Sequence, residues 1–281
     1  MKLMQEHIFQ TAKGNIHYWM NEFDESRQTL VLLPGLSADH HLFDKQVEAF
    51  ESEYNLLVWD APGHAASRPF ELTFTLADKA SWLHEILKTE EVQKPILVGQ
   101  SMGGYVSQAF LQYYPSEANG FISIDSAPLQ RKFYPSWELW LLDKVEPMYR
   151  LYPWKILVEQ GAKGCAVTEY GRQLMAQIMH AYDDDPKYYA RLVGHGYGML
   201  ADAIKADLPY RIDCPCLLLC GEKDKAGDTK KFNRKWTASE NLFIQWIPNA
   251  GHNSNTDQPE IVNELIRKFI KNINNTYHDN F

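Results

Sequence analysis

The chain has 281 residues, of which 45% are hydrophobic and 23% charged, an ordinary composition for a soluble globular protein with a sizeable core. Its formal net charge of -8 argues against a nucleic-acid partner, because binding to phosphates requires a basic surface. Residues 1–15 lack the apolar segment of a signal peptide, and no run approaches the ~18 apolar residues of a membrane span. We therefore expect a cytoplasmic protein with one large domain, or a core that carries an insertion.

The cysteines point in the same direction. Three of the four fall within the apolar segment CPCLLLC, and no pair has the C-x-x-C spacing of zinc and redox motifs. We expect free, buried thiols, as is usual where the surroundings keep thiols reduced. No metal site or cofactor motif is predicted. The cysteines are Cys165, Cys214, Cys216 and Cys220.

The predicted elements begin with a hairpin over residues 6–20 that turns at Lys13-Gly14. Short, wholly apolar strands then alternate with amphipathic helices. This alternation predicts an α/β fold, in which a mostly parallel sheet is covered by helices on both faces. The expected strands are 29–33, 55–59, 95–98, 120–124, 216–219 and 242–247, and the expected helices are 42–50, 76–87, 105–113 and 261–273.

Residues 128–209 interrupt the alternation, because they contain helix-like segments rich in aromatic residues and no convincing strand. We interpret them as a helical cap inserted between two core strands, with 1–127 and 210–273 as the core and 274–281 as a polar tail. Most aromatic side chains of the cap would form its own core. Others would face the carboxyl ends of the strands, where open α/β sheets bind ligands.

The stretch VGQSMGGY places Ser101 between glycines two residues away on either side. The pattern G-x-S-x-G is weak alone, since chance supplies it in roughly one chain in ten of this length. Here it follows a predicted buried strand and opens a predicted helix, which is the context of a nucleophile elbow. Such a turn would hold the Ser101 hydroxyl away from the sheet, and Gly99 and Gly103 would let strand and helix approach closely.

A serine hydroxyl is a good nucleophile only when an oriented base removes its proton. The predicted strand in LLLCGEKD leads into a loop that carries Asp224, and the last strand, in FIQWIPNAGH, leads into a loop that carries His252. The order Ser101, Asp224, His252 along the chain is that of the α/β-hydrolase triad.

These blocks resemble the α/β-hydrolases of the capped, lipase- and esterase-like branch. LLPGL, WDAPGHAAS, VGQSMGG, LLLCGEKD and IPNAGHNSNTDQPE follow the family's order over nearly the whole chain. The resemblance implies Ser101 as nucleophile, His252 as general base and acid, and Asp224 as the residue that orients the imidazolium. Some members place the acid at the position of Asp125, after the strand 120–124, but GEKD matches the commoner arrangement and favours Asp224.

An oxyanion hole requires two N–H donors. Met102, directly after the elbow serine, is expected at the start of the following helix and would offer a backbone N–H that has no partner within the helix. The resemblance implies Leu36, after Pro34-Gly35, as the second donor. Many relatives have His-Gly in place of Pro34-Gly35, but the donor is backbone, so the hole is expected here as well.

Neighbouring polar residues have plainer interpretations. Asp60, in WDAPGHA, is expected to tie down its own turn, and His64 to be structural. His40 and His41 lie beside the oxyanion loop, where contact with substrate and simple exposure both remain open.

The sequence as a whole predicts a cofactor-free serine hydrolase that cleaves a small-to-medium carboxylic ester, thioester or lactone through an acyl-enzyme. The same fold and triad also serve C–C bond hydrolysis, perhydrolysis and a lyase step, and a non-catalytic ligand-binding protein is a further alternative. The aromatic cap indicates a substrate with an apolar acyl or alkyl group. Oligomeric state is not readable. The candidate substrate contacts are Tyr105, Trp137, Trp140 and Trp154.

Overall fold

The computed structural model describes residues 4–278, which fold around an eight-stranded sheet of order β1-β2-β4-β3-β5-β6-β7-β8. The pairs β1–β2 and β2–β4 are antiparallel, and every other pair is parallel. The predicted fold class is therefore confirmed. The strands are β1 (Gln5–Thr11), β2 (Gly14–Met20), β3 (Thr29–Leu33), β4 (Asn55–Trp59), β5 (Ile96–Gln100), β6 (Gly120–Ile124), β7 (Cys216–Gly221) and β8 (Ile244–Ile247).

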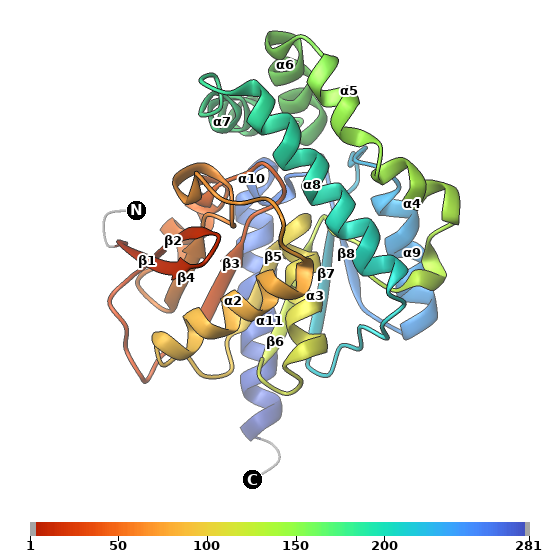
Figure 1. Ribbon diagram of the computed structural model, residues 1–281. Helices are drawn as coiled ribbons and strands as arrows, with labels where there is room; N and C mark the ends of the chain where they lie inside the picture. The colour runs from red at the N-terminus through yellow and green to blue at the C-terminus, as the bar shows by residue number, and fades with distance from the viewer. Residues whose placement is uncertain (1–3, 279–281) are drawn as a thin grey trace.

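Helices cover both faces of the sheet (Figure 1). In β3, Val31 and Leu33 belong to a hydrophobic cluster with α2 (Leu76–Thr89) and α3 (Met102–Tyr113). Leu30 and Leu32 belong to a second cluster with α1 (Asp44–Phe50) and α11 (Pro259–His278). Side chains of a strand point alternately to its two faces, so burial on both explains why the strand is apolar throughout. The helices are α1 (Asp44–Phe50), α2 (Leu76–Thr89), α3 (Met102–Tyr113), α4 (Ser136–Leu142), α5 (Val145–Leu151), α6 (Trp154–Cys165), α7 (Glu169–His180), α8 (Pro186–Lys205), α9 (Thr229–Glu240), α10 (Ser254–Asp257) and α11 (Pro259–His278), with short 3-10 helices at His40–Phe43, Ala65–Ser67 and Arg131–Phe133.

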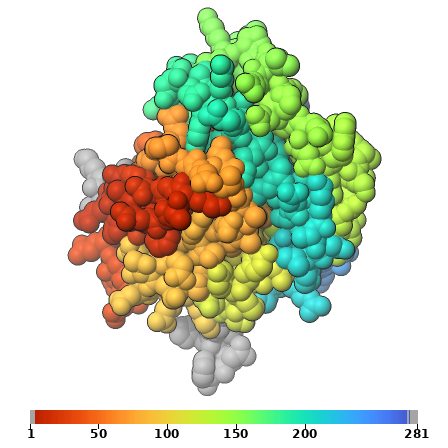
Figure 2. All heavy atoms as spheres, viewed as in Figure 1, coloured from red at the N-terminus to blue at the C-terminus, as the bar shows by residue number. Residues whose placement is uncertain are grey.

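The segment between β6 and β7 carries α4 to α8 and is called here the helical insertion. It has its own hydrophobic cluster, which includes Val158, Met175 and Ile178. It also contacts loops at the carboxyl ends of the strands, because Tyr188 Oη donates a hydrogen bond of 2.9 Å to the Gly63 carbonyl. The insertion therefore lies over the edge of the sheet at which parallel strands end (Figures 1 and 2).

The last helix is longer than the sequence predicted. α11 continues past residue 273 to His278, so residues 274–278 of the expected tail are helical, and residues 279–281 lie outside the described residues. Within residues 4–278, no helix combines the length and the apolarity needed to cross a bilayer. All four cysteines are free thiols; Cys220 is buried and the other three are half-buried.

Candidate active site

Ser101 is the one residue between β5 and α3. Its φ of 48° and ψ of -113° lie in a region that residues other than glycine avoid, and its N–H donates 2.8 Å to the carbonyl of Ile124 on β6. Strain of this kind persists only where surrounding structure enforces it, and it occurs mostly at functional positions. The turn has the conformation expected of a nucleophile elbow.

Two glycines make this turn possible. A Cβ added to Gly99 would lie 2.4 Å from the Gly103 carbonyl carbon, and a Cβ added to Gly103 would lie 1.8 Å from the Leu33 carbonyl oxygen. Both distances are far inside contact range. Strand β5, strand β3 and helix α3 thus approach one another more closely than any side chain would permit, as the motif predicted.

The structure brings the three predicted triad residues together. His252 Nε2 lies 2.8 Å from Ser101 Oγ, and His252 Nδ1 lies 3.0 Å from Asp224 Oδ2. Asp224 follows β7, and its second oxygen, Oδ1, accepts a hydrogen bond of 2.8 Å from the Ala226 N–H. Asp224 is 2% exposed, so its charge acts on the imidazole with little screening by water.

The environment of His252 favours its charged form. Burial lowers the pKa of the imidazole, but the negative charge of Asp224, the hydrogen bond to it and the more distant Asp125 together raise that pKa above its usual value. A histidine with raised basicity accepts a proton from a hydroxyl more readily. The geometry and the electrostatics are therefore both those of a general base.

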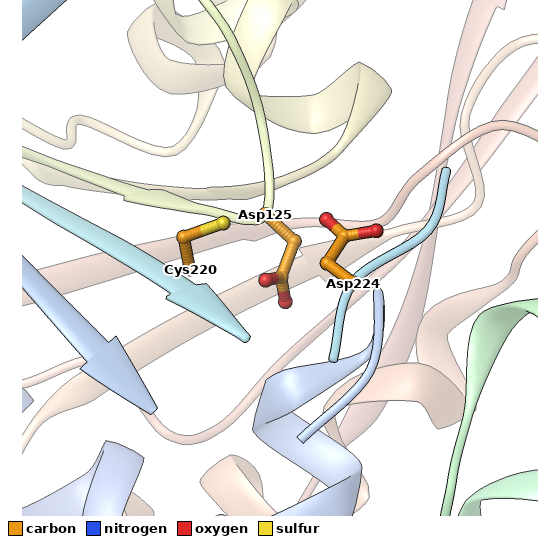
Figure 3. Close-up of side chains that lie close together, drawn as sticks. All are labelled: Asp125, Cys220 and Asp224. Atoms are coloured by element: carbon orange, nitrogen blue, oxygen red, sulfur yellow. The ribbon is translucent and has the colours of Figure 1, made fainter. Parts of the chain in front are cut away.

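Asp125, the alternative acid, lies next to Asp224 (Figure 3) but has a different set of contacts. Its Oδ1 accepts 2.7 Å from the Gly221 N–H and its Oδ2 accepts 2.8 Å from the Ser254 N–H. Burial and the nearby charge of Asp224 hold the pKa of Asp125 well above its ordinary range. Asp125 thus ties the end of β7 to the segment after His252, and it is Asp224 that bonds the imidazole.

Figure 3 also shows Cys220 beside these two carboxylates, with one donor atom from each residue within 4.8 Å of the others. Three such groups could ligate a cation. All four carboxylate oxygens, however, already accept a hydrogen bond from the protein. The arrangement suits a braced acid pair better than a metal site.

The predicted oxyanion loop lies directly against the serine. A Cβ added to Gly35 would lie 3.1 Å from Ser101 Cβ. Residues 35–38 form a turn in which the Ala38 N–H donates 3.2 Å to the Gly35 carbonyl and Ser37 has a φ of 63°. That turn does not use the N–H of Leu36. The N–H of Met102, at the first position of α3, likewise has no partner within its helix.

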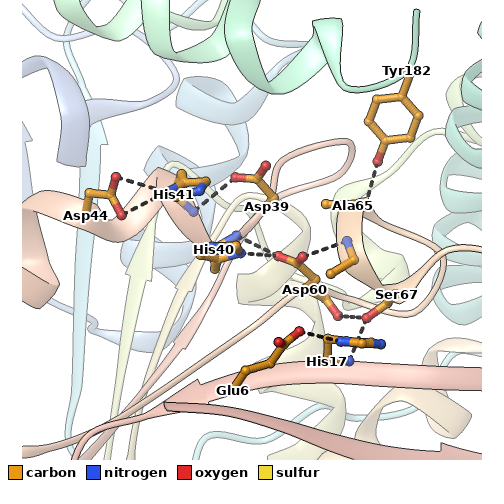
Figure 4. Close-up of polar contacts among 11 residues, drawn as sticks. Glu6, His17, Asp39, His40, His41, Asp44, Asp60, Ala65, Ser67 and Tyr182 are labelled. Atoms are coloured by element: carbon orange, nitrogen blue, oxygen red, sulfur yellow. Dashed lines mark hydrogen bonds and ion pairs between the residues drawn. The ribbon is translucent and has the colours of Figure 1, made fainter. Parts of the chain in front are cut away.

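A polar network around Asp39, His40 and Asp60 begins directly after this loop in the chain (Figure 4). Asp60 Oδ1 is 2.8 Å from both the backbone nitrogen and Nδ1 of His40, and Asp60 Oδ2 accepts 2.9 Å from the Ala66 N–H. The prediction that Asp60 ties down its own turn is confirmed. Asp39 accepts 3.0 Å from the His41 N–H, and burial together with the charge of Asp60 raises the pKa of Asp39 to about 6. These bonds hold the loop after β3 and the loop after β4 together.

Gln100 is a site residue that the sequence did not reveal. Its Nε2 donates 2.7 Å to the His252 carbonyl and 3.2 Å to Asn253 Oδ1. Its Oε1 lies against Gly35, where an added Cβ would be 2.3 Å away. The 1% exposed side chain therefore joins the oxyanion loop to the histidine loop, and both to the elbow. A buried amide next to the serine is visible in the sequence, but its partners, 152 and 153 residues away, are not.

The predicted substrate contacts lie in different places. Tyr105, on α3, is half-buried, and burial raises its pKa to about 12, with a contact to Tyr134 opposing and the charge of Asp224 adding to that shift. It is therefore a neighbour of the site. The structure does not bring Trp137 and Trp140 there, because α4 turns them outward, 61% and 60% exposed, and points Leu139 inward.

Trp154 is half-buried and packs on the hydrophobic cluster of the helical insertion. Its Nε1 donates 2.6 Å to Asp183 Oδ1, and its ring meets Tyr189 edge-on at 5.0 Å between centroids. Tyr189 in turn donates 3.2 Å from its hydroxyl to Ser37 Oγ, next to the oxyanion loop. Trp154 thus packs behind Tyr189, which itself contacts that loop.

Comparison with known proteins agrees with this geometry. A family model described as "Alpha/beta hydrolase family" matches residues 30–265. The chain belongs to the α/β-hydrolase family. The match runs from β3 through the first part of α11 and so contains the elbow, the acid loop, the histidine loop and the helical insertion between them.

Individual α/β-hydrolases are distant from this chain in sequence. A Bacillus subtilis protein described as an uncharacterized hydrolase, YugF, is 23% identical over 93% of this chain and 96% of its own length. The 3-oxoadipate enol-lactonase 1 of Acinetobacter baylyi is 24% identical over 89% of this chain and 91% of its own. The structure of a thermophilic esterase from Thermogutta terrifontis superposes with a TM-score of 0.73, at 21% identity, over 96% of this chain and 99% of that one.

Proposed function

We propose that this α/β-hydrolase is a serine hydrolase that cleaves small-to-medium carboxylic esters, or related thioesters and lactones, through an acyl-enzyme. The observation that carries the proposal is the position of the His252 ring, with Nε2 2.8 Å from Ser101 Oγ and Nδ1 3.0 Å from Asp224 Oδ2. Distances of this size are those of a nucleophile with an oriented base. An enol-lactonase and an esterase among the similar proteins support the same class of bond.

In the first half-reaction, His252 Nε2 takes the hydroxyl proton as Ser101 Oγ attacks the carbonyl carbon. Asp224, hydrogen-bonded to Nδ1, stabilises the imidazolium that forms. The tetrahedral intermediate then expels the alkoxide, thiolate or enolate, which receives the proton from His252, and the acyl group stays on Ser101. Water, deprotonated by His252, hydrolyses the acyl-enzyme and restores the serine.

The negative charge on the carbonyl oxygen is assigned to the N–H groups of Leu36 and Met102. Gly35 contacts Ser101, and the turn over residues 35–38 leaves the Leu36 N–H unused, which supports the first assignment. Met102 is the first residue of α3, so its N–H lies at the end of the helix where the dipole also favours negative charge. Preorganised donors of this kind stabilise the transition state more than the ground state.

The substrate is proposed to be a small molecule with an apolar acyl or alkyl group, taken without a metal or cofactor, in the cytoplasm. Tyr105, one helical turn after Ser101 on α3, is proposed as a substrate contact, and the charge of Asp224 reaches its hydroxyl. Leu36 extends the apolar side of the site toward the insertion, since it packs with the clusters of both core and insertion.

Replacement of Ser101 by alanine is the direct test. The variant should lose about 10⁵–10⁶-fold in turnover of a p-nitrophenyl ester, because no other group supplies the nucleophile. It should also lose labelling by a fluorophosphonate probe. The matched control is Ser107→Ala, which removes a buried serine of α3, the helix that follows Ser101; its Oγ donates 3.0 Å to the Gly103 carbonyl. Ser101→Ala with undiminished esterase activity would sink the mechanism.

A further inference from the structure

Asp257, the last residue of α10, is a buried carboxylate at the place where the core meets the helical insertion. α10 contacts α7 of the insertion there (Figure 1). Asp60 and Asp224 each pair with a histidine, whereas Asp257 has no lysine, arginine or histidine within 4.0 Å among residues 4–278. A carboxylate buried in this way is costly unless hydrogen bonds offset its charge, so its donors show what it holds.

One oxygen of Asp257 holds the turn between α6 and α7, residues 165–168. Oδ1 accepts 2.9 Å from the Thr168 N–H, 2.6 Å from the Thr168 hydroxyl and 3.2 Å from the Val167 N–H. Thr168 is also the N-cap of α7, because its Oγ1 accepts 3.1 Å from the Gly171 N–H. The carboxylate therefore fixes the start of a helix of the insertion.

The other oxygen of Asp257 holds the histidine loop. Oδ2 accepts 2.8 Å from the N–H of Gly251, the residue directly before His252, and 3.0 Å from the Val167 N–H. A single carboxylate thus bridges the backbone next to the catalytic histidine and the backbone of the insertion.

The residue after His252 is bonded to the same turn. The Asn253 N–H donates 2.8 Å to the carbonyl of Cys165. The segments are in close contact, since a Cβ added to Gly251 would lie 3.0 Å from the Cys165 carbonyl oxygen and 3.2 Å from Asp257 Oδ2. Both neighbours of His252 are consequently bonded to residues 165–168, one directly and one through Asp257.

The position of the His252 ring depends on this backbone. Its Nε2 lies 2.8 Å from Ser101 Oγ and its Nδ1 lies 3.0 Å from Asp224 Oδ2, and a displacement of about 1 Å in such a constellation can cost on the order of 100-fold in rate. Gln100 holds the His252 carbonyl from the side of the elbow. The contacts through Asp257 hold the same loop from the side of the insertion.

We propose that Asp257 is a positioning residue for His252 and makes catalysis depend on how the insertion is seated on the core. The role rests on the proposed function, in which His252 is the base. Asp257 acts through the Gly251 N–H and the turn 165–168. Because its donors come from two segments, displacement of either segment leaves a buried charge short of partners. Substitutions on the insertion side of this contact should therefore reach the histidine.

Asp257→Asn tests the role directly. The amide keeps the shape of the side chain, but its NH2 group must face an N–H donor where an oxygen now accepts. We expect kcat for a soluble p-nitrophenyl ester to fall by about 10–100-fold, with KM within about twofold. The rate at which a fluorophosphonate labels Ser101 should fall by a similar factor, because labelling also needs the base, while every molecule is still labelled in the end.

Thr168→Val tests the dependence on the insertion. It removes the hydroxyl donor at 2.6 Å but leaves the carboxylate and its backbone partners in place, so it also carries the test if Asp257→Asn does not fold. We expect kcat and the labelling rate to fall by about 3–10-fold. In the double variant, kcat should fall by less than the product of the two single effects, because both changes remove the same contact.

Two controls match these changes away from the histidine loop. Thr75→Val removes the N-cap of α2, whose Oγ1 accepts 3.1 Å from the Asp78 N–H, and should lower the melting temperature about as much as Thr168→Val. Asp185→Asn alters the N-cap acid of α8, which bonds the Tyr188 N–H within the insertion. Both controls should keep kcat and the labelling rate within about twofold.

Two outcomes would overturn the role of Asp257 alone, in an active parent. One is labelling of Asp257→Asn at the full rate but in only a fraction of the molecules, which indicates a structural tie. The other is equal kcat values for Asp257→Asn and Asp185→Asn. A parent that neither hydrolyses esters nor reacts with the probe would instead overturn the proposed function, and this role with it.

Discussion

The loops at the carboxyl ends of the sheet and the outer helices of the insertion hold their side chains in opposite ways. In the loops, Asp125, Gln100 and Asp224 are almost completely buried, and each accepts or donates at least two hydrogen bonds. On α4 and α5, Trp140 and Leu151 are mostly exposed. The loop side chains are held in fixed positions by the protein, whereas those on the outer side of α4 and α5 mostly face solvent.

The difference has a physical origin in the fold. Each loop of the site is attached to a strand that is packed on both faces, so its polar groups must find partners inside the protein. The helices α4 and α5 pack mainly against α8. Their outer positions carry no packing constraint, and apolar residues there need another explanation. A comparison of substitutions in the two regions makes this division testable.

The largest effect should come from the acid that contacts the imidazole. Asp224→Asn should lower kcat by about 10⁴-fold, because His252 loses both its orienting partner and the stabilisation of its charge. Asp125→Asn is the matched control, since it alters an equally buried carboxyl that bonds only backbone N–H groups. Asp125→Asn should lower kcat by at most about tenfold, through the loss of one of its two hydrogen bonds to backbone N–H groups. The reverse ranking of the two variants would make Asp125 the acid.

The pH dependence of kcat/KM is an independent test of the interaction between Asp224 and His252. His252 acts as a base only when neutral, so kcat/KM should rise with pH as the free enzyme loses that proton. The charge of Asp224 raises the pKa of His252, and Asp224→Asn removes that charge. The acid limb of the residual activity should therefore move to lower pH. An unshifted limb would mean that Asp224 does not act on the group that titrates.

The sequence predicted the elements of the core because their signals are local. Apolar strands such as TLVLL and NLLVW, and the order of Ser101, Asp224 and His252, can be interpreted without knowing which segments meet. The bracing roles of Gln100 and Asp125 depend on partners about a hundred residues away or more, so no local pattern revealed them. The prediction that Trp137 and Trp140 contact the substrate has a different weakness. Their place in the sequence puts them on a helix of the insertion, but it does not say what that side of the helix faces.

A medium effect is expected from Gln100, which should act as a positioning residue. Gln100→Leu keeps the volume but removes the bonds to the His252 carbonyl and Asn253, and kcat should fall by about 10–100-fold while KM changes little. Gln108→Leu is the control, because Gln108 is an equally buried glutamine that bonds Ala127 and Leu129 instead. Both variants should lower the melting temperature. Equal kcat values for the two would reduce Gln100 to a structural role.

The smallest effect is expected from the tryptophans of the insertion. Trp137→Ser and Trp140→Ser should leave kcat/KM for a soluble ester within about twofold and the free energy of unfolding within ~0.5 kcal/mol, because both side chains are more than half exposed. Tyr105→Ala, one helical turn after Ser101 on α3, should change KM for the same ester by more than either. Steady-state kinetics across a series of acyl-chain lengths distinguishes the two positions. A tryptophan variant that altered the preferred chain length would return α4 to the substrate pocket, and would mean that its outer face closes over the site during turnover.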